Sequence, residues 1–136
     1  MKYDQMAQTK VRRPIAVMFD LMADYMGHTR PEAFREAIFF LLRREGLDRP
    51  EFDVHPRGRR IRNTQKADEL PNEIDTVLLQ TFLTYDQHHR LIRAEIAMGI
   101  TTPMILRDAV YAYMWSNGYK SNRPSNDLPT VYGEDD

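Results

Sequence analysis

Two segments of this chain match each other at a constant separation of 72 residues, without a gap, and this internal repeat limits the folds open to it. A repeat of this kind indicates that one supersecondary unit occurs twice. Both copies are therefore expected to fold in the same way. The matched pairs are Met26 with Met98, Gly27 with Gly99, Thr29 with Thr101, Pro31 with Pro103, Arg35 with Arg107, Glu36 with Asp108, Ala37 with Ala109, and Gly46 with Gly118.

The first copy has the pattern of a strand followed by two helices. Residues 4–11 form a short, rather polar stretch with strand character, and Pro14 suits the first turn of a helix. The apolar residues of that helix recur at i, i+3 and i+4, and Gly27 supplies the left-handed residue that commonly ends a helix. Thr29 is expected to cap the second helix, with Glu32 completing a capping box.

The second copy repeats this order with poorer amphipathicity. Residues 76–83 are rich in β-branched, leucine and aromatic side chains, so they predict a strand more strongly than the first copy does. Thr84 is the expected cap of the next helix, which ends at Gly99. Either Thr101 or Thr102 then caps the last helix.

These patterns divide the chain into four parts. Residues 3–47 form the first unit and residues 75–119 form the second. Residues 48–74 carry proline, glycine and many charges, and we interpret them as a basic linker. Residues 120–136 are expected to form a mobile acidic tail.

The two copies of the motif resemble the ribbon-helix-helix family of DNA-binding proteins. The resemblance is carried by residues 25–38 (YMGHTRPEAFREAI) and residues 97–110 (AMGITTPMILRDAV), each with a Gly-x-Thr turn and an Arg-acid-Ala sequence on the second helix. Members of the family pair two units, and their strands form an antiparallel ribbon that enters the major groove. The tandem arrangement is similar to that of the accessory proteins that bind the transfer origin of conjugative plasmids.

The resemblance implies a mainly α fold with a short two-stranded antiparallel ribbon. One strand alone leaves its edges unpaired, and two helices alone cannot close a core. A tandem chain can meet both needs by pairing its own two copies as an intramolecular pseudo-dimer. The linker of residues 48–74 is long enough to connect the two copies when they are paired in this way.

Side chains of a strand alternate between its two faces, so one set of strand residues is expected to face the groove. Because glutamine can pair with adenine and lysine with guanine, we expect Gln8, Lys10 and Gln80 to contact bases, and Phe82 to contact a thymine methyl group. Two alternatives remain open. The polar residues can simply be solvated, and an outward Phe82 can mean an inverted strand or a face that meets protein.

A second group of residues is expected to contact the DNA backbone. The N-termini of helices attract phosphate, and the linker contains a dense basic run. Ordinary helix capping also explains the threonines, and a solvated linker also explains the basic run. Arg35 and Arg107, inside the second helix of each copy, are interpreted as structural. The expected backbone contacts are Arg12, Arg13, Thr29, Arg30, Thr101, Thr102, Arg59 and Arg60.

Charge and composition restrict the remaining possibilities. The net charge is −1, but residues 1–68 carry 14 Lys/Arg against 10 Asp/Glu, whereas residues 69–136 carry 5 against 10. Cysteine is absent and no apolar run is long enough to cross a membrane, so we expect a cytoplasmic protein. The adjacent His88 and His89 make a poor metal pair, and no catalytic motif is found. We expect no enzyme activity, cofactor, metal or small-molecule substrate.

The sequence therefore predicts a sequence-specific binder of double-stranded DNA. A transcriptional repressor or regulator is the first expectation, and chains can also associate side by side on DNA. The alternatives are a conjugation (relaxosome) accessory protein, an antitoxin, and a protein–protein interaction module that has kept the fold without binding DNA.

Overall fold

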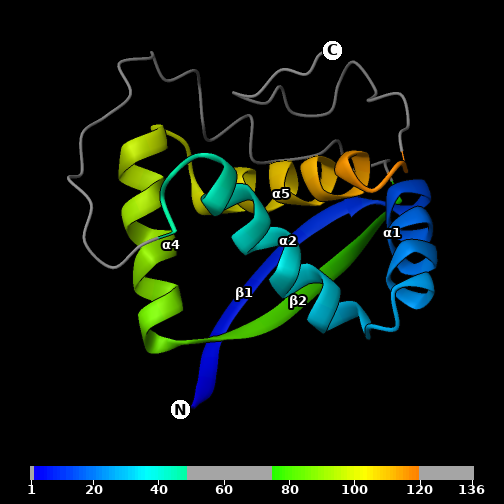
Figure 1. Ribbon diagram of the computed structural model, residues 1–136, viewed down its shortest axis with the longest axis horizontal. Coiled ribbons are helices and arrows are strands. Elements are labelled where there is room, and N and C mark those ends of the chain that lie inside the picture. The colour runs from blue at the N-terminus through cyan, green and yellow to red at the C-terminus, as the bar shows by residue number, and fades with distance from the viewer. Residues whose placement is uncertain (1, 49–74, 120–136) are drawn as a thin grey trace.

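The computed structural model describes residues 2–48 and 75–119, which form a two-stranded antiparallel sheet and four helices (Figure 1). The predicted mainly α fold with one antiparallel strand pair is confirmed at this level. The predicted tail, and the predicted linker from residue 49 onward with Arg59 and Arg60, lie outside the described residues. The elements are β1 (Tyr3–Arg12), α1 (Arg13–Tyr25), α2 (Arg30–Arg44), β2 (Thr76–Thr84), α4 (Tyr85–Met98) and α5 (Thr102–Ser116).

The helix boundaries follow from local chemistry in three of the four helices. Proline lies in the first turn of α1, where no intrahelical N–H donor is needed. Thr29 and Glu32 form the predicted capping box of α2. Thr84 caps α4 in the same way with Gln87, and Gly99 ends that helix in the left-handed conformation.

The start of α5 differs from the prediction. Thr101 occupies the N-cap position, but its side chain accepts no capping hydrogen bond. The backbone N–H of Thr102 instead donates to Glu95 Oε2 of α4, 3.1 Å away. A carboxylate from the preceding helix therefore satisfies the first free N–H of α5, whereas a hydroxyl at the N-cap would accept from an N–H further into the first turn.

The two strands pair with a register that is symmetric with respect to the repeat. Gln8 lies opposite Gln80, Met6 opposite Phe82, and Lys10 opposite Leu78. Because Gln8 and Gln80 are separated by the repeat length of 72, the two copies of the strand meet at equivalent residues. The register of the ribbon is thus centred on the Gln8–Gln80 pair.

The core lies on one face of this ribbon. Alternation along the strands buries one set of side chains against α2 and α5, which also pack against each other. Within the described residues, α2 has its main strand contact with β2, and α5 has its main strand contact with β1, so each half covers the strand of the other. Each fully buried aliphatic or aromatic side chain contributes roughly 1.5–3 kcal/mol. The strand residues of the core are Ala7, Thr9, Val11, Leu79, Thr81 and Leu83.

Two equivalent threonines of the core have different hydrogen bonding. Thr9 Oγ1 donates to the carbonyl oxygen of Pro103 at 3.1 Å. The equivalent hydroxyl of Thr81, which is 1% exposed, has no hydrogen-bond partner among the described residues. A buried hydroxyl without a partner costs free energy that a methyl group of similar volume does not.

We expect the two Thr→Val substitutions to affect stability differently. Thr9→Val removes the side-chain hydrogen bond to the Pro103 carbonyl and should lower the free energy of unfolding by about 1 kcal/mol. Thr81→Val should leave the free energy of unfolding unchanged or raise it. Urea denaturation of both variants measures this difference, and equal losses in both would contradict the assignment.

Candidate nucleic-acid interface

The solvent face of the ribbon brings together all four predicted base-contacting residues. Gln8, Lys10 and Phe82 are exposed, and Gln80 is half-buried. The strand parity predicted from the sequence is therefore the one observed. Three cross-strand pairs form the middle of this face: Met6 with Phe82, Gln8 with Gln80, and Lys10 with Leu78.

The chemistry of this face is more apolar than that of a typical nucleic-acid surface. Met6 is 49% exposed, and Leu78 and Phe82 are each 43% exposed. Gln80 Nε2 donates to the sulfur of Met6 at 3.2 Å, so the central pair contacts the apolar pair beside it. Lys10 is the one charged residue among these six. The face can offer amide hydrogen bonds, one ammonium group and apolar contact.

Two arginines hold the ribbon from its buried side. Arg35 Nε of α2 donates to the carbonyl oxygen of Phe82 at 3.0 Å, and Arg107 Nε of α5 donates to the carbonyl oxygen of Lys10 at 3.3 Å. Donors and acceptors are both related by the repeat length of 72. The Arg35 guanidinium also lies 4.6 Å from the centroid of the Tyr3 ring. These contacts agree with the structural interpretation of the two arginines.

The basic residues at the end of β1 are engaged within the chain. Arg13 forms a two-point contact with the carboxylate of Asp75, with distances of 2.6 and 3.1 Å, and its backbone N–H donates to the Asp75 carbonyl. This ion pair raises the pKa of Arg13 and lowers the pKa of Asp75. Arg12 is half-buried at the N-cap of α1. The contact with Asp75 fastens the start of β2 to α1.

The N-terminus of α2 already holds a carboxylate of the same chain. The backbone N–H of Thr29 donates to Glu32 Oε1 at 2.8 Å, and this bond lowers the pKa of Glu32. Arg30 pairs with Asp20 at 2.6 and 2.8 Å, which raises the pKa of Arg30. A guanidinium has five N–H donors, so Arg30 can hold Asp20 and still donate elsewhere. A phosphate at this helix end would compete with Glu32.

The N-terminus of α5 also holds a carboxylate of the same chain, because Glu95 accepts a hydrogen bond from the Thr102 N–H. Thr101 and Thr102 are half-buried there. At both helix ends that were expected to bind phosphate, a carboxylate of the chain thus accepts from a backbone N–H. The sequence predicted the Glu32 carboxylate at α2 but not the Glu95 carboxylate at α5, because Glu95 belongs to the preceding helix and only the fold brings it to α5.

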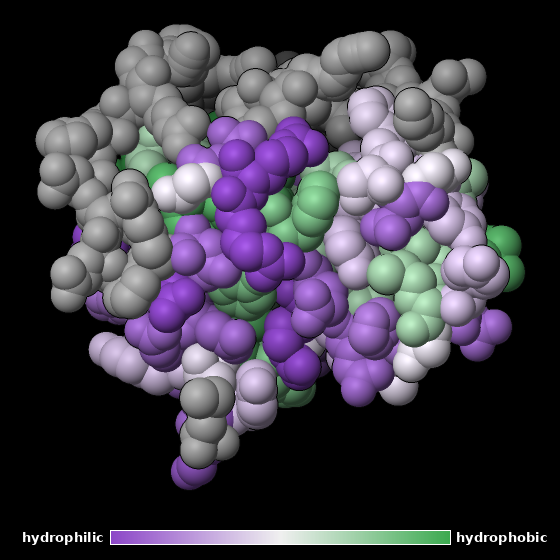
Figure 2. All heavy atoms as spheres, in the orientation of Figure 1, coloured by the Kyte–Doolittle hydropathy of each residue, from purple (hydrophilic) through white to green (hydrophobic). Residues whose placement is uncertain are grey.

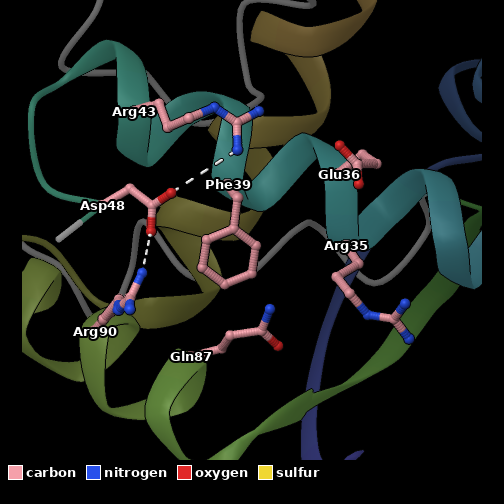
Figure 3. A pocket seen from close by; sticks show the side chains of 7 residues that line it. All are labelled: Arg35, Glu36, Phe39, Arg43, Asp48, Gln87 and Arg90. Atoms are coloured by element: carbon pink, nitrogen blue, oxygen red, sulfur yellow. Dashed lines mark hydrogen bonds and ion pairs between the residues drawn. The ribbon is translucent and has the colours of Figure 1, made fainter. Parts of the chain in front are cut away.

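A small open pocket of about 170 Å³ lies between α2 and α4 (Figure 3). Asp48 accepts from Arg90 Nη1 at 2.9 Å and lies 3.8 Å from Arg43 Nη1, so it joins the two helices. Asp48 was expected to begin the linker, but its carboxylate contacts Arg43 of α2 and Arg90 of α4. The exposed side of α2 around this pocket is strongly hydrophilic (Figure 2). The pocket is lined by Arg35, Glu36, Phe39, Arg43, Asp48, Gln87 and Arg90.

Comparison with family models, curated proteins and solved structures finds no match for this chain. Within residues 2–48 and 75–119, no cluster of three or more metal-ligating side chains occurs. None of the helices described has the length and apolar character needed to cross a bilayer. The ribbon face, with its three outward cross-strand pairs, is the candidate site.

The ion pairs of Asp48 generate a stability prediction. Asp48→Asn removes the charge that both arginines contact in a half-buried setting, and it should lower the free energy of unfolding by about 1–2 kcal/mol. Asp24→Asn makes the same chemical change on the exposed surface of α1 and should cost less than about 0.5 kcal/mol. Thermal or urea denaturation compares the two, and equal values would show that Asp48 does not join the helices.

Proposed function

We propose that this chain is a tandem ribbon-helix-helix protein that reads double-stranded DNA with its β1–β2 ribbon. The single observation that carries the proposal is an exposed two-stranded antiparallel ribbon with α2 and α5 packed behind it. The major groove is wide enough for two strands, and outward strand residues can then reach base edges.

The pseudo-symmetry of the ribbon supports an intramolecular pseudo-dimer. Equivalent residues meet at Gln8 and Gln80, and equivalent arginines bond to equivalent carbonyls on the opposite strand. Two identical chains paired in this way would have a true twofold axis at the same place. One chain supplies both halves here, so no second chain is needed to complete the ribbon.

The two ends of the ribbon would recognise different bases. Met6 and Phe82 form an apolar end suited to thymine methyl groups, whereas Lys10 at the other end suits guanine. The central Gln8–Gln80 pair suits adenine. The equivalent of Lys10 in the second copy is Phe82, so the recognised site would not be a palindrome.

Regulation of transcription, as a repressor, is the role we propose first. A small domain that reads a site and blocks access to it needs no other activity. Roles as a conjugation accessory protein or as an antitoxin use the same ribbon and follow from the same proposal.

Selection of bound duplexes from a random pool should yield a non-palindromic motif. Lys10→Ala should relax preference at one end of that motif, and Gln80→Ala should relax it at the centre, each by about 1–3 kcal/mol of discrimination. Arg44→Ala removes one positive charge at the C-terminal end of α2 and is the matched control for Lys10→Ala. Fluorescence anisotropy with the selected duplex measures each affinity.

The proposal fails if no motif is enriched, or if Lys10→Ala and Arg44→Ala have the same effect at every position of the site. Far-ultraviolet circular dichroism of each variant separates loss of binding from loss of folding. Lys10 and Arg44 are both exposed, so we expect their variants to keep the fold.

A second candidate function is favoured by the apolar side chains of the face. Met6, Leu78 and Phe82 would suit a protein partner docked on the ribbon. Salt dependence distinguishes the two functions. Binding DNA through about three phosphate contacts should weaken roughly 10- to 100-fold between 50 and 200 mM salt, whereas an apolar protein contact should change little. Isothermal titration across this range provides the measurement.

A further inference from the structure

One end of the outward ribbon face carries an acidic side chain beside apolar ones. A β-bulge interrupts the pairing between Tyr3 and Gln5, and Asp4 is the extra residue there. The Tyr3 ring lies against Arg35 of α2, and Gln5 pairs with a buried leucine of β2, so both neighbours of the extra residue face the helix side. Asp4 itself is exposed, and strand alternation places it on the same face as Met6.

The Asp4 carboxylate can accept a hydrogen bond from a ligand. Its Oδ1 atom accepts from Gln5 Nε2 at 3.1 Å. A carboxylate has about four acceptor sites, so Asp4 can hold Gln5 and accept a further N–H. Beside it, Met6 and Phe82 form the cross-strand pair at this end of the ribbon. The acidic corner, defined as Asp4, Met6 and Phe82, therefore offers a carboxylate next to apolar surface.

The acidic corner differs from the opposite end of the ribbon. There the exposed ammonium group of Lys10 lies opposite Leu78. A cation is attracted by phosphates and by base acceptors alike, whereas a carboxylate that faces DNA is repelled by the phosphates. An acid on this face favours binding only where a base presents a hydrogen-bond donor. Asp4 thus restricts the bases that fit this end of the ribbon.

The chemistry of the major groove narrows the choice of base. Cytosine and adenine present an exocyclic amino donor there, and a C5 methyl group occurs on thymine. Thymine would place its O4 acceptor against the carboxylate, whereas unmodified cytosine has the amino group without the methyl group. In N6-methyladenine the remaining N6–H is used in base pairing. 5-Methylcytosine presents a free amino donor and a methyl group on adjacent ring atoms.

We propose, on the basis of the proposed function, that the acidic corner recognises 5-methylcytosine and makes DNA binding by this chain respond to cytosine methylation. Asp4 accepts from the N4 amino group, and Met6 and Phe82 contact the C5 methyl group. Thymine at this position keeps the methyl contact and lacks the hydrogen bond. Unmodified cytosine keeps the hydrogen bond and lacks the methyl contact. Each is therefore the weaker ligand.

Fluorescence anisotropy of the full chain on four versions of the selected duplex tests this inference. The pyrimidine at which Phe82→Ala relaxes the selected motif is made cytosine, 5-methylcytosine, uracil or thymine, each with its complementary purine. The wild type should bind 5-methylcytosine about 3- to 5-fold more tightly than cytosine, because a methyl group leaves water. It should bind cytosine about 10-fold more tightly than uracil, which has an oxygen in place of the amino group.

Variants of the acidic corner separate the two contacts. Met6→Ala and Phe82→Ala should each reduce the gain from methylation and keep the preference for cytosine over uracil. Asp4→Asn should remove the preference for cytosine over uracil, because a carboxamide both donates and accepts, and should keep the gain from methylation. Asp24→Asn makes the same chemical change on the exposed surface of α1 and should behave like the wild type. Circular dichroism spectra confirm that each variant is folded.

Equal binding of 5-methylcytosine and cytosine by the wild type would overturn this inference. So would an unchanged preference for cytosine over uracil in Asp4→Asn, or a motif that Phe82→Ala relaxes at no position. A motif that is selected but does not respond to methylation overturns the role of the acidic corner alone and leaves the proposed function standing. If no motif is enriched from the random pool, the proposed function fails and this inference fails with it.

Discussion

Pairing of β1 with β2 is the interaction on which the rest of this fold depends. A single strand leaves a row of N–H and C=O groups without partners on each edge, and neither helix pair has a closed core of its own. The pairing joins segments more than 60 residues apart and gives α2 and α5 a common surface. Once the strands are in register, one face of the ribbon is buried and the other is left to solvent.

The register also fixes where the second helices attach. Arg35 and Arg107 reach across to the backbone of the opposite strand at equivalent carbonyls, so each half of the chain holds the ribbon strand of the other half. A shift of one residue would turn every outward side chain inward. The two arginines oppose such a shift, since they bond to the backbone carbonyls of Lys10 and Phe82. Positioning of the outward side chains is thereby tied to packing of the helices behind them.

The strands, the helix starts and the outward face could be predicted from the sequence, because they depend on local residue patterns and on the internal repeat. The alternation of side chains along residues 76–83, together with the repeat length of 72, places Gln8 and Gln80 on the outward face. Thr29 and Glu32 define the start of a helix. The contacts that escaped prediction join elements distant in sequence. Glu95 caps the following helix, and Asp48 joins α2 to α4. No spacing rule indicates such contacts, because they depend on how the helices pack.

Positions of the two strands that are 72 residues apart differ in chemistry. Equivalent positions hold Lys10 and Phe82 on the ribbon, and Thr9 and Thr81 differ in hydrogen bonding within the core. Two identical chains cannot differ in this way, because every substitution appears in both halves. A chain that carries both copies can change one end of the ribbon without changing the other.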